Sequence, residues 1–226
     1  MKKLLLVAVF VASLGLTAAA ESPIKLSLYD DIAWPKPHKT NVVLGIIDNN
    51  TPTVHGVSLA IGSSRANEML GLSAALVYAR SKKLRGLQSA IYNVTYDTKG
   101  ITYSLVDNNK GTFVGGQLGA INLAKDMTGL QWGLYDQADK LAGVQFGAIN
   151  YAKRSEFGIQ AGFVNVADNL TGVQWGFVNV AKRFSGLQFG FVNVISRIDR
   201  GLQIGLVNVI SHNGYFPAMI LVNGKF

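Results

Sequence analysis

The chain has 226 residues and no cysteine, which excludes a disulfide framework and thiolate metal sites. Hydrophobic residues make up 49% of the sequence and charged residues only 15%, with a formal net charge of +8. Such a basic excess can indicate nucleic acid as a partner, but the export signal at the N-terminus argues against it. We therefore expect no nucleic-acid partner.

Residues 1–20 have the organisation of a secretory signal peptide. Lys2 and Lys3 supply the positive charge, an apolar stretch runs from Leu4 to Leu16, and Ala18 to Ala20 form a small-residue cleavage site. The stretch is shorter than the ~20 residues that a membrane-spanning helix needs. We predict an exported protein. Residues 21–40 are expected to hold one strand, Ile24 to Tyr29, and a loop that contains proline.

From Asn41 to the C-terminus, one unit recurs thirteen times at intervals of 14 or 15 residues. Its clearest copies, Gly172 to Asn179 and Gly186 to Asn193, read G-x-Q-x-G-x-x-N. A constant period means that one supersecondary element is reused, so residues 41–226 are predicted to form a single domain. The units begin at Asn41, Gly56, Gly71, Gly86, Gly100, Gly115, Gly129, Gly143, Gly158, Gly172, Gly186, Gly201 and Phe216.

Each unit predicts a strand with two unlike faces. When the first glycine is numbered position 1, apolar side chains occupy positions 2, 4 and 6, as in Leu187, Phe189 and Phe191, and alternate with Gly and Gln. No Lys or Arg occupies positions 1 to 9 of any unit. A solvent-exposed sheet surface normally carries some charged residues, so neither face resembles one.

The leading fold prediction is all-β, an antiparallel meander closed as a transmembrane barrel of about 14 short strands. Nine residues span about 30 Å, which in a tilted strand matches the apolar height of an outer-membrane barrel. Phe226 would serve as the terminal assembly signal. The prediction implies outer-membrane lipid and the barrel assembly machinery as partners. It assigns Trp132, Phe146, Trp175, Phe189 and Ile204 to lipid, and Gln117, Gln131, Gln145, Gln160, Gln174, Gln188 and Gln203 to a water-filled lumen.

The alternative fold is a parallel β-solenoid in which each unit forms one coil of 14 or 15 residues. Two observations favour it: the repeat is a single strand rather than a hairpin, and no alternate turns are long. Strict alternation also places the position-8 Asn on the apolar face, so a barrel needs a bulge near position 7 or an Asn at the headgroup boundary. The sequence leaves both architectures open.

The units, together with both ends of the chain, resemble the bacterial surface-repeat proteins. The resemblance rests on the G-[LV]-Q-x-G-[LF]-[VI]-N pattern, on the opening Ile24 to Tyr29 with Trp34-Pro35, and on the closing Asn213 to Pro217 with Phe226. It covers essentially the whole chain after residue 20. It implies placement at the cell surface or outer membrane and assigns no activity.

Chemistry-bearing motifs are absent from the sequence. There is no G-x-S-x-G elbow, H-E-x-x-H pair or phosphate-binding GK[ST] loop, and His38, His55 and His212 have no second ligand at metal spacing. We therefore predict a non-enzymatic surface protein without metal or cofactor, either structural or a passive and weakly selective pore. The alternative function, which accompanies the solenoid, is a secreted or surface-attached adhesion or spacer module. The oligomeric state is not predicted.

Overall fold

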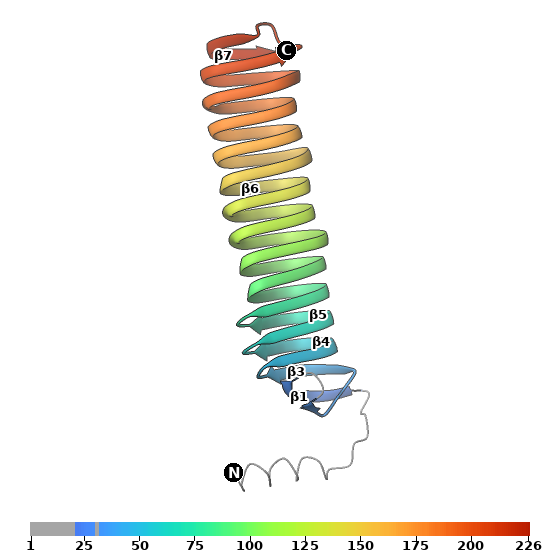
Figure 1. Cartoon of the computed structure of the whole chain (residues 1–226). Helices are drawn as coiled ribbons and strands as arrows, with labels where there is room; N and C mark the ends of the chain where they lie inside the picture. The colour runs from blue at the N-terminus through green and yellow to red at the C-terminus, as the bar shows by residue number, and fades with distance from the viewer. Residues whose placement is uncertain (1–20, 30–31) are drawn as a thin grey trace.

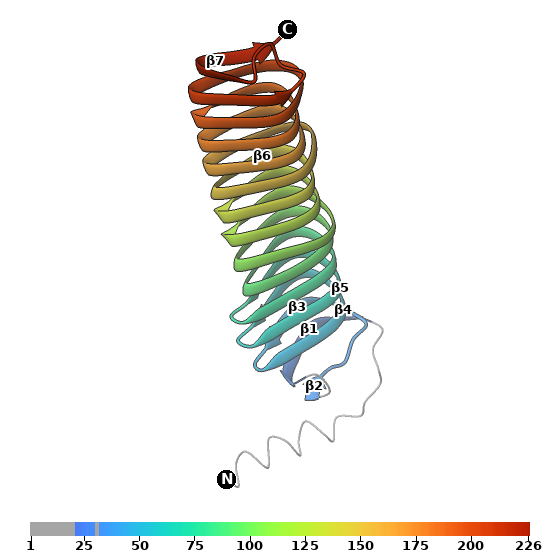
Figure 2. The ribbon, with the colours of Figure 1, turned by 45° about the horizontal axis from the view of Figure 1, so that its top comes forward.

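The protein is a rod of stacked β-coils (Figure 1). The computed structural model describes residues 21–29 and 32–226, among which there is no helix. The predicted signal peptide, residues 1–20, lies outside this part of the chain. The strands are β1 (Glu21–Tyr29), β2 (Ile32–Trp34), β3 (Lys39–Gly45), β4 (Asp48–Ala60), β5 (Ser63–Ala75), β6 (Tyr78–His212) and β7 (Ala218–Lys225). β6 winds through most of the rod, with strand geometry unbroken around its corners (Figures 1 and 2).

Successive coils pair in parallel, with each unit directly over the previous one. Gly56 lies beside Gly71, and Gly71 beside Gly86, so the first positions of successive units form one column. Likewise Ser58, Ser73 and Gln88 share the third column. The molecule is therefore a parallel β-solenoid, and like positions stack on like positions in every unit before the last, which forms the antiparallel β7.

The antiparallel transmembrane barrel was the wrong prediction, and the alternative solenoid describes the fold. The pairings β1–β3, β3–β4, β4–β5 and β5–β6 are all parallel, whereas the predicted meander requires antiparallel neighbours. The physical reason lies in the amides of the repeat. In-register parallel stacking sets each Gln against another Gln, so the side chains satisfy one another without water.

Antiparallel strands occur only at the two ends of the described rod. β2 pairs with β1 at one end, and β7 pairs with the last coil at the other, where Gly201 lies beside Lys225. β7 thus covers the edge that β6 would otherwise leave unpaired. Phe226 follows β7 with its side chain 87% exposed, and its N–H donates to the Tyr215 hydroxyl at 3.3 Å. Its predicted role as an assembly signal stays a prediction.

Gly172 and Gly176, at positions 1 and 5 of one unit, are required for different reasons. Gly172, at position 1, has a φ of 142°, and a Cβ there would collide with the carbonyl oxygen of Gly158 in the coil below. Gly176, at position 5, has no room for a Cβ because the Asn165 side chain and the Gly162 carbonyl oxygen occupy that space. Gly172 therefore supplies a backbone conformation that other residues rarely adopt, and Gly176 makes space for the neighbouring amide.

An apolar column completes the interior beside the amides. It comes from the residues that follow position 9 and includes Ala181, Phe184, Ile195 and Ile198, all at most 1% exposed. Equivalent clusters around Phe113 and around Val43 continue it toward the N-terminal end. The residues after position 9 thus continue the coil and bury every second or third side chain.

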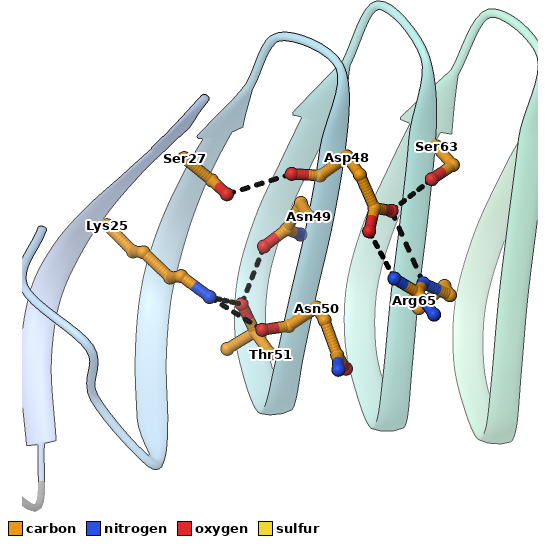
Figure 3. A network of polar contacts seen from close by, with 8 residues as sticks. All are labelled: Lys25, Ser27, Asp48, Asn49, Asn50, Thr51, Ser63 and Arg65. Atoms are coloured by element: carbon orange, nitrogen blue, oxygen red, sulfur yellow. Dashed lines mark hydrogen bonds and ion pairs between the residues drawn. The ribbon is translucent and has the colours of Figure 1, made fainter. Parts of the chain in front are cut away.

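The first coils replace the amides with hydroxyl and charged groups (Figure 3). Buried Lys25 donates to the Asn50 carbonyl oxygen at 2.6 Å and to the Thr51 hydroxyl at 3.0 Å. Asp48 pairs with Arg65 and accepts a hydrogen bond from Ser63. Burial raises the pKa of Asp48, but the hydrogen bonds from Arg65 and Ser63 and the Arg65 charge outweigh it, so the pKa lies below its ordinary value.

Candidate functional site: the amide interior and the apolar outer face

The position-3 glutamines form a continuous hydrogen-bonded ladder inside the coils. Gln131 Nε2 donates to Gln117 Oε1 at 2.8 Å, and the same bond repeats from coil to coil up to Gln203. Gln145 Nε2 also donates to the Tyr151 carbonyl oxygen at 3.0 Å, and most of the other glutamines make the equivalent bond. A carbonyl oxygen only accepts, so this second bond sets the orientation of each amide.

The position-8 asparagines form a second ladder, which runs in the opposite direction. Asn165 Nδ2 donates to Asn179 Oδ1 at 2.8 Å, and Asn179 Nδ2 to Asn193 Oδ1 at 2.8 Å, so donors here point toward the C-terminal end. The chain bends at positions 6 and 7, where two consecutive side chains such as Leu206 and Val207 are exposed. This corner, rather than a barrel bulge, brings position 8 to the inside.

The inner face is a closed interior and not a water-filled lumen. All seven glutamines assigned to a lumen have no exposed surface, and their amides are bonded to one another and to the backbone. The sequence correctly separated them from the apolar columns, but it placed water where the structure has packed side chains. The glutamines concerned are Gln117, Gln131, Gln145, Gln160, Gln174, Gln188 and Gln203.

Two carboxyl groups take the place of Asn within the second ladder. Asp107 and Asp136 have no exposed surface, and burial raises the pKa of each to about 6. Gln117 Nε2 donates to Asp107 Oδ1 at 3.2 Å, and Asn122 Nδ2 donates to Asp136 Oδ1 at 2.7 Å. The second oxygen of each carboxyl group lacks a hydrogen-bond partner. The sequence shows Asp at these two positions where other units have Asn, but it does not show that the acids are buried.

The outer surface of the coils has an apolar part and a charged part. The apolar part is formed by the side chains at positions 2, 4, 6 and 7 of the units, and we call it the apolar face. The residues predicted to meet lipid all lie on it: Trp132 is 58% exposed, Trp175 64%, and Phe146 and Phe189 about half, with Ile204 less so. Contiguous apolar surfaces are typical of interaction sites. The contact with lipid itself stays a prediction.

The apolar face carries an aromatic ridge in its C-terminal half. Phe163, Phe177 and Phe191 stack in parallel with ring centroids 5.0 and 4.9 Å apart, one ring per coil. Beside them, Trp175 meets Phe189 edge to face at 6.5 Å. We define the aromatic ridge as these five residues. Their mutual contacts hold the rings in place, so the ridge is a preformed surface.

The N-terminal half of the same face is hollowed. A depression of about 740 Å³ lies where positions 4 to 6 carry small residues such as Ser89, Ala90, Gly119 and Ala120. Larger residues border it; we define the apolar hollow by its complete lining. That lining is Ala75, Leu76, Ser89, Ala90, Ile91, Tyr103, Ser104, Leu105, Leu118, Gly119, Ala120, Trp132, Gly133 and Leu134.

The remaining circumference of the coils is charged. Lys182 and Asp168 form an ion pair at 2.8 Å between neighbouring coils, and Lys140 and Asp126 do so at 3.3 Å. Exposed pairs of this kind contribute little to stability. Their position shows instead that charge is confined to one part of the outer surface, beside an apolar face that carries none.

Neither a metal centre nor a helical membrane span occurs among residues 21–29 and 32–226. No three His, Asp or Glu side chains in these segments lie close enough together to hold a metal ion. In the same part of the chain, no helix has the length and apolar character needed to cross a membrane.

Comparisons with family models, with curated proteins and with solved structures returned no match to this chain.

Proposed function

We propose that this chain is an exported, non-enzymatic β-solenoid that works at the bacterial surface as a structural adhesion module. The observation that carries the proposal is the contrast between its two surfaces. The interior is filled by bonded amides and apolar side chains, whereas the outside presents a rigid and charge-free apolar face. Such a molecule acts through its outer surface.

Four further observations support the proposal. The leader sequence is typical of export, and the resemblance to bacterial surface-repeat proteins implies the cell surface. The solenoid fold fits a spacer or adhesion role, because each added coil lengthens a rod without changing its cross-section. The buried Gln column offers no water-filled path, so the fold favours this function over the passive pore.

Surface labelling and electrical recording together test the proposal. Antibody to the native rod should label intact cells, and the purified protein should produce no conductance in planar bilayers. Cytoplasmic retention of the native protein would contradict the surface assignment. Stable single-channel conductance steps would instead support a passive pore. An Asp136→Asn variant should behave like wild type in both measurements, because the substitution is confined to the interior.

A further inference from the structure

We propose that two copies of this solenoid pair through their apolar faces in antiparallel orientation, with the aromatic ridge of each copy seated in the apolar hollow of the other. This inference deepens the proposed adhesion function by naming the partner, which is a second copy of the chain. It rests on the size, the charge pattern and the relief of the apolar face.

The apolar face has the dimensions of a stable protein interface. Eleven coils at about 4.8 Å and six strand residues at about 3.4 Å give a patch of roughly 50 by 20 Å, or about 1,000 Å² per copy. Stable complexes bury about 800 Å² per partner. The patch contains no Lys, Arg or Glu, is rich in Trp, Tyr and Phe, and is bordered by charge, as at the centre and rim of protein interfaces.

Symmetry then determines which residues meet. Two flat faces related by a two-fold axis must have that axis in the plane between them. If the axis runs along the strands, the rods are antiparallel, and position 4 of one copy lies over position 4 of the other. Centring the hollow over the ridge places the axis between the coils of Trp132 and Phe146.

This arrangement sets a large side chain over a small one in four of the eight pairs of positions, two in each column. In the position-4 column, Trp132 meets the partner's Phe146 beside the axis. Farther out, Phe189 lies over Ser89, which lines the apolar hollow. The complete set of pairs is Leu118 with Ala161, Ser89 with Phe189, Tyr103 with Trp175 and Trp132 with Phe146 at position 4, and Ala120 with Phe163, Leu134 with Ala148, Leu105 with Phe177 and Ile91 with Phe191 at position 6.

The other two-fold arrangement leaves the faces poorly matched. With the axis along the rod, the copies are parallel and each coil meets its own equivalent. The aromatic ridge then presses against itself, Phe177 against the partner's Trp175, while the two apolar hollows enclose an empty space. Unfilled space of this kind is costly in a packed interface. The relief of the face therefore favours the antiparallel pair.

Sedimentation of the full, exported chain in detergent-free buffer is the first test. The wild type should sediment as a dimer, and Phe177→Lys should weaken dimerisation by on the order of 30-fold or more. Phe157→Lys is the matched control, because Phe157 is 69% exposed but lies outside the apolar face. A wild type that stays monomeric, or equal effects of the two variants, would overturn the proposal. So would a monomer that floats with phosphatidylethanolamine vesicles, since lipid would then cover the face.

Cross-linking tests the relative orientation of the two rods. The chain has no native cysteine, so each introduced cysteine is the only site that a thiol reagent can modify. A mixture of Ser89→Cys and Phe189→Cys chains should give a cross-linked dimer with a short bismaleimide, whereas Phe189→Cys alone should not. In the antiparallel pair, the two Phe189 sites lie about seven coils apart, roughly 34 Å. Efficient self-cross-linking of Phe189→Cys would indicate parallel rods and refute the pairing.

The two proposals fail in different ways. A monomer on the cell surface would refute the pairing and leave the surface module standing. A dimer confined to the cytoplasm would support the pairing and refute the surface assignment.

Discussion

At the scale of single residues, Asp136 occupies a site built for an amide. Beside Gly190, the side-chain atoms nearest to the place of a Cβ are the bonded Asn179 Nδ2 and Asn193 Oδ1. Beside Gly147, the corresponding atoms are Asp136 Oδ2 and Asn150 Oδ1, 2.8 and 3.1 Å from that place, and neither has a hydrogen-bond partner. Two oxygen acceptors face each other where an N–H normally donates. A proton on Asp136 Oδ2 would supply the missing donor and continue the ladder.

We therefore expect Asp136→Asn to stabilise the protein at neutral pH. Burial raises the folded-state pKa of Asp136 to about 6 from an ordinary value of 3.8, and no charged group contributes to the shift. A raised acid pKa means that the stability is fully present below about pH 4 and is lost as the pH rises through 6. The substitution should add up to about 3 kcal/mol to the free energy of unfolding at pH 8, and little at pH 4. Chemical denaturation at the two pH values measures this.

Asp48→Asn is the control of opposite sign. The pKa of Asp48 is held below its ordinary value through Arg65 and Ser63, so its contribution is present above about pH 4 and is lost as the pH falls. This substitution should destabilise the protein at pH 8 and less so at low pH. If Asp136→Asn destabilised the protein equally at both pH values, the carboxyl group would not be protonated in the ladder.

At the scale of the strand, the sequence predicted the two faces well and the direction of pairing poorly. The alternation of Leu187, Phe189 and Phe191 with Gln188 is visible in one unit, because side chains alternate along any strand. Whether strands pair in parallel or antiparallel depends on how neighbouring units are arranged. The residue pattern of a single unit is compatible with both a hairpin strand and a solenoid coil, so it does not predict the direction of pairing. The position-8 Asn was the informative residue, because a two-faced barrel had no simple place for it.

A pair of adjacent substitutions separates the closed interior from a wet lumen. Gln188→Lys should prevent folding or cost several kcal/mol, because it buries a charge and breaks two steps of the Gln ladder. Phe189→Lys should fold, because Phe189 is 48% exposed, although it should weaken pairing of the faces. Circular dichroism and thermal unfolding compare the two. A Gln188→Lys protein as stable as wild type would indicate water inside the coils.

The apolar hollow and the aromatic ridge could not be predicted from the sequence. Residues such as Trp132 and Phe189 were assigned to one outward column, and the structure places them there. The apolar hollow and the aromatic ridge depend on how side chains of different size align over many coils, which requires the stacking register.

At the scale of the molecule, the solenoid should tolerate the loss of a whole coil. Deleting residues 172–185 joins Thr171 to Gly186 and places Gln188 over Gln160 and Asn193 over Asn165, so both ladders close. The shortened rod should keep its β-sheet circular dichroism, with a modest decrease in unfolding temperature.

Deleting residues 172–178 is the matched control. It removes half a coil and brings Asn179, rather than a glycine, to the turn after Thr171, so the ladders are interrupted. This variant should unfold or aggregate. If both deletions had the same effect on the spectrum and on the unfolding temperature, stacking register would not govern the fold.

The opposed polarity of the two amide ladders bears on how long such a rod can grow. Aligned side-chain dipoles add up along a column, so a single ladder would build an electrostatic gradient from one tip to the other that increases with every unit. Here the Gln donors point toward the N-terminal tip and the Asn donors toward the C-terminal tip, so the two gradients oppose each other. Adding or removing a whole unit would then change both gradients by similar amounts and in opposite directions, so the electrostatic difference between the two tips would stay small at any length.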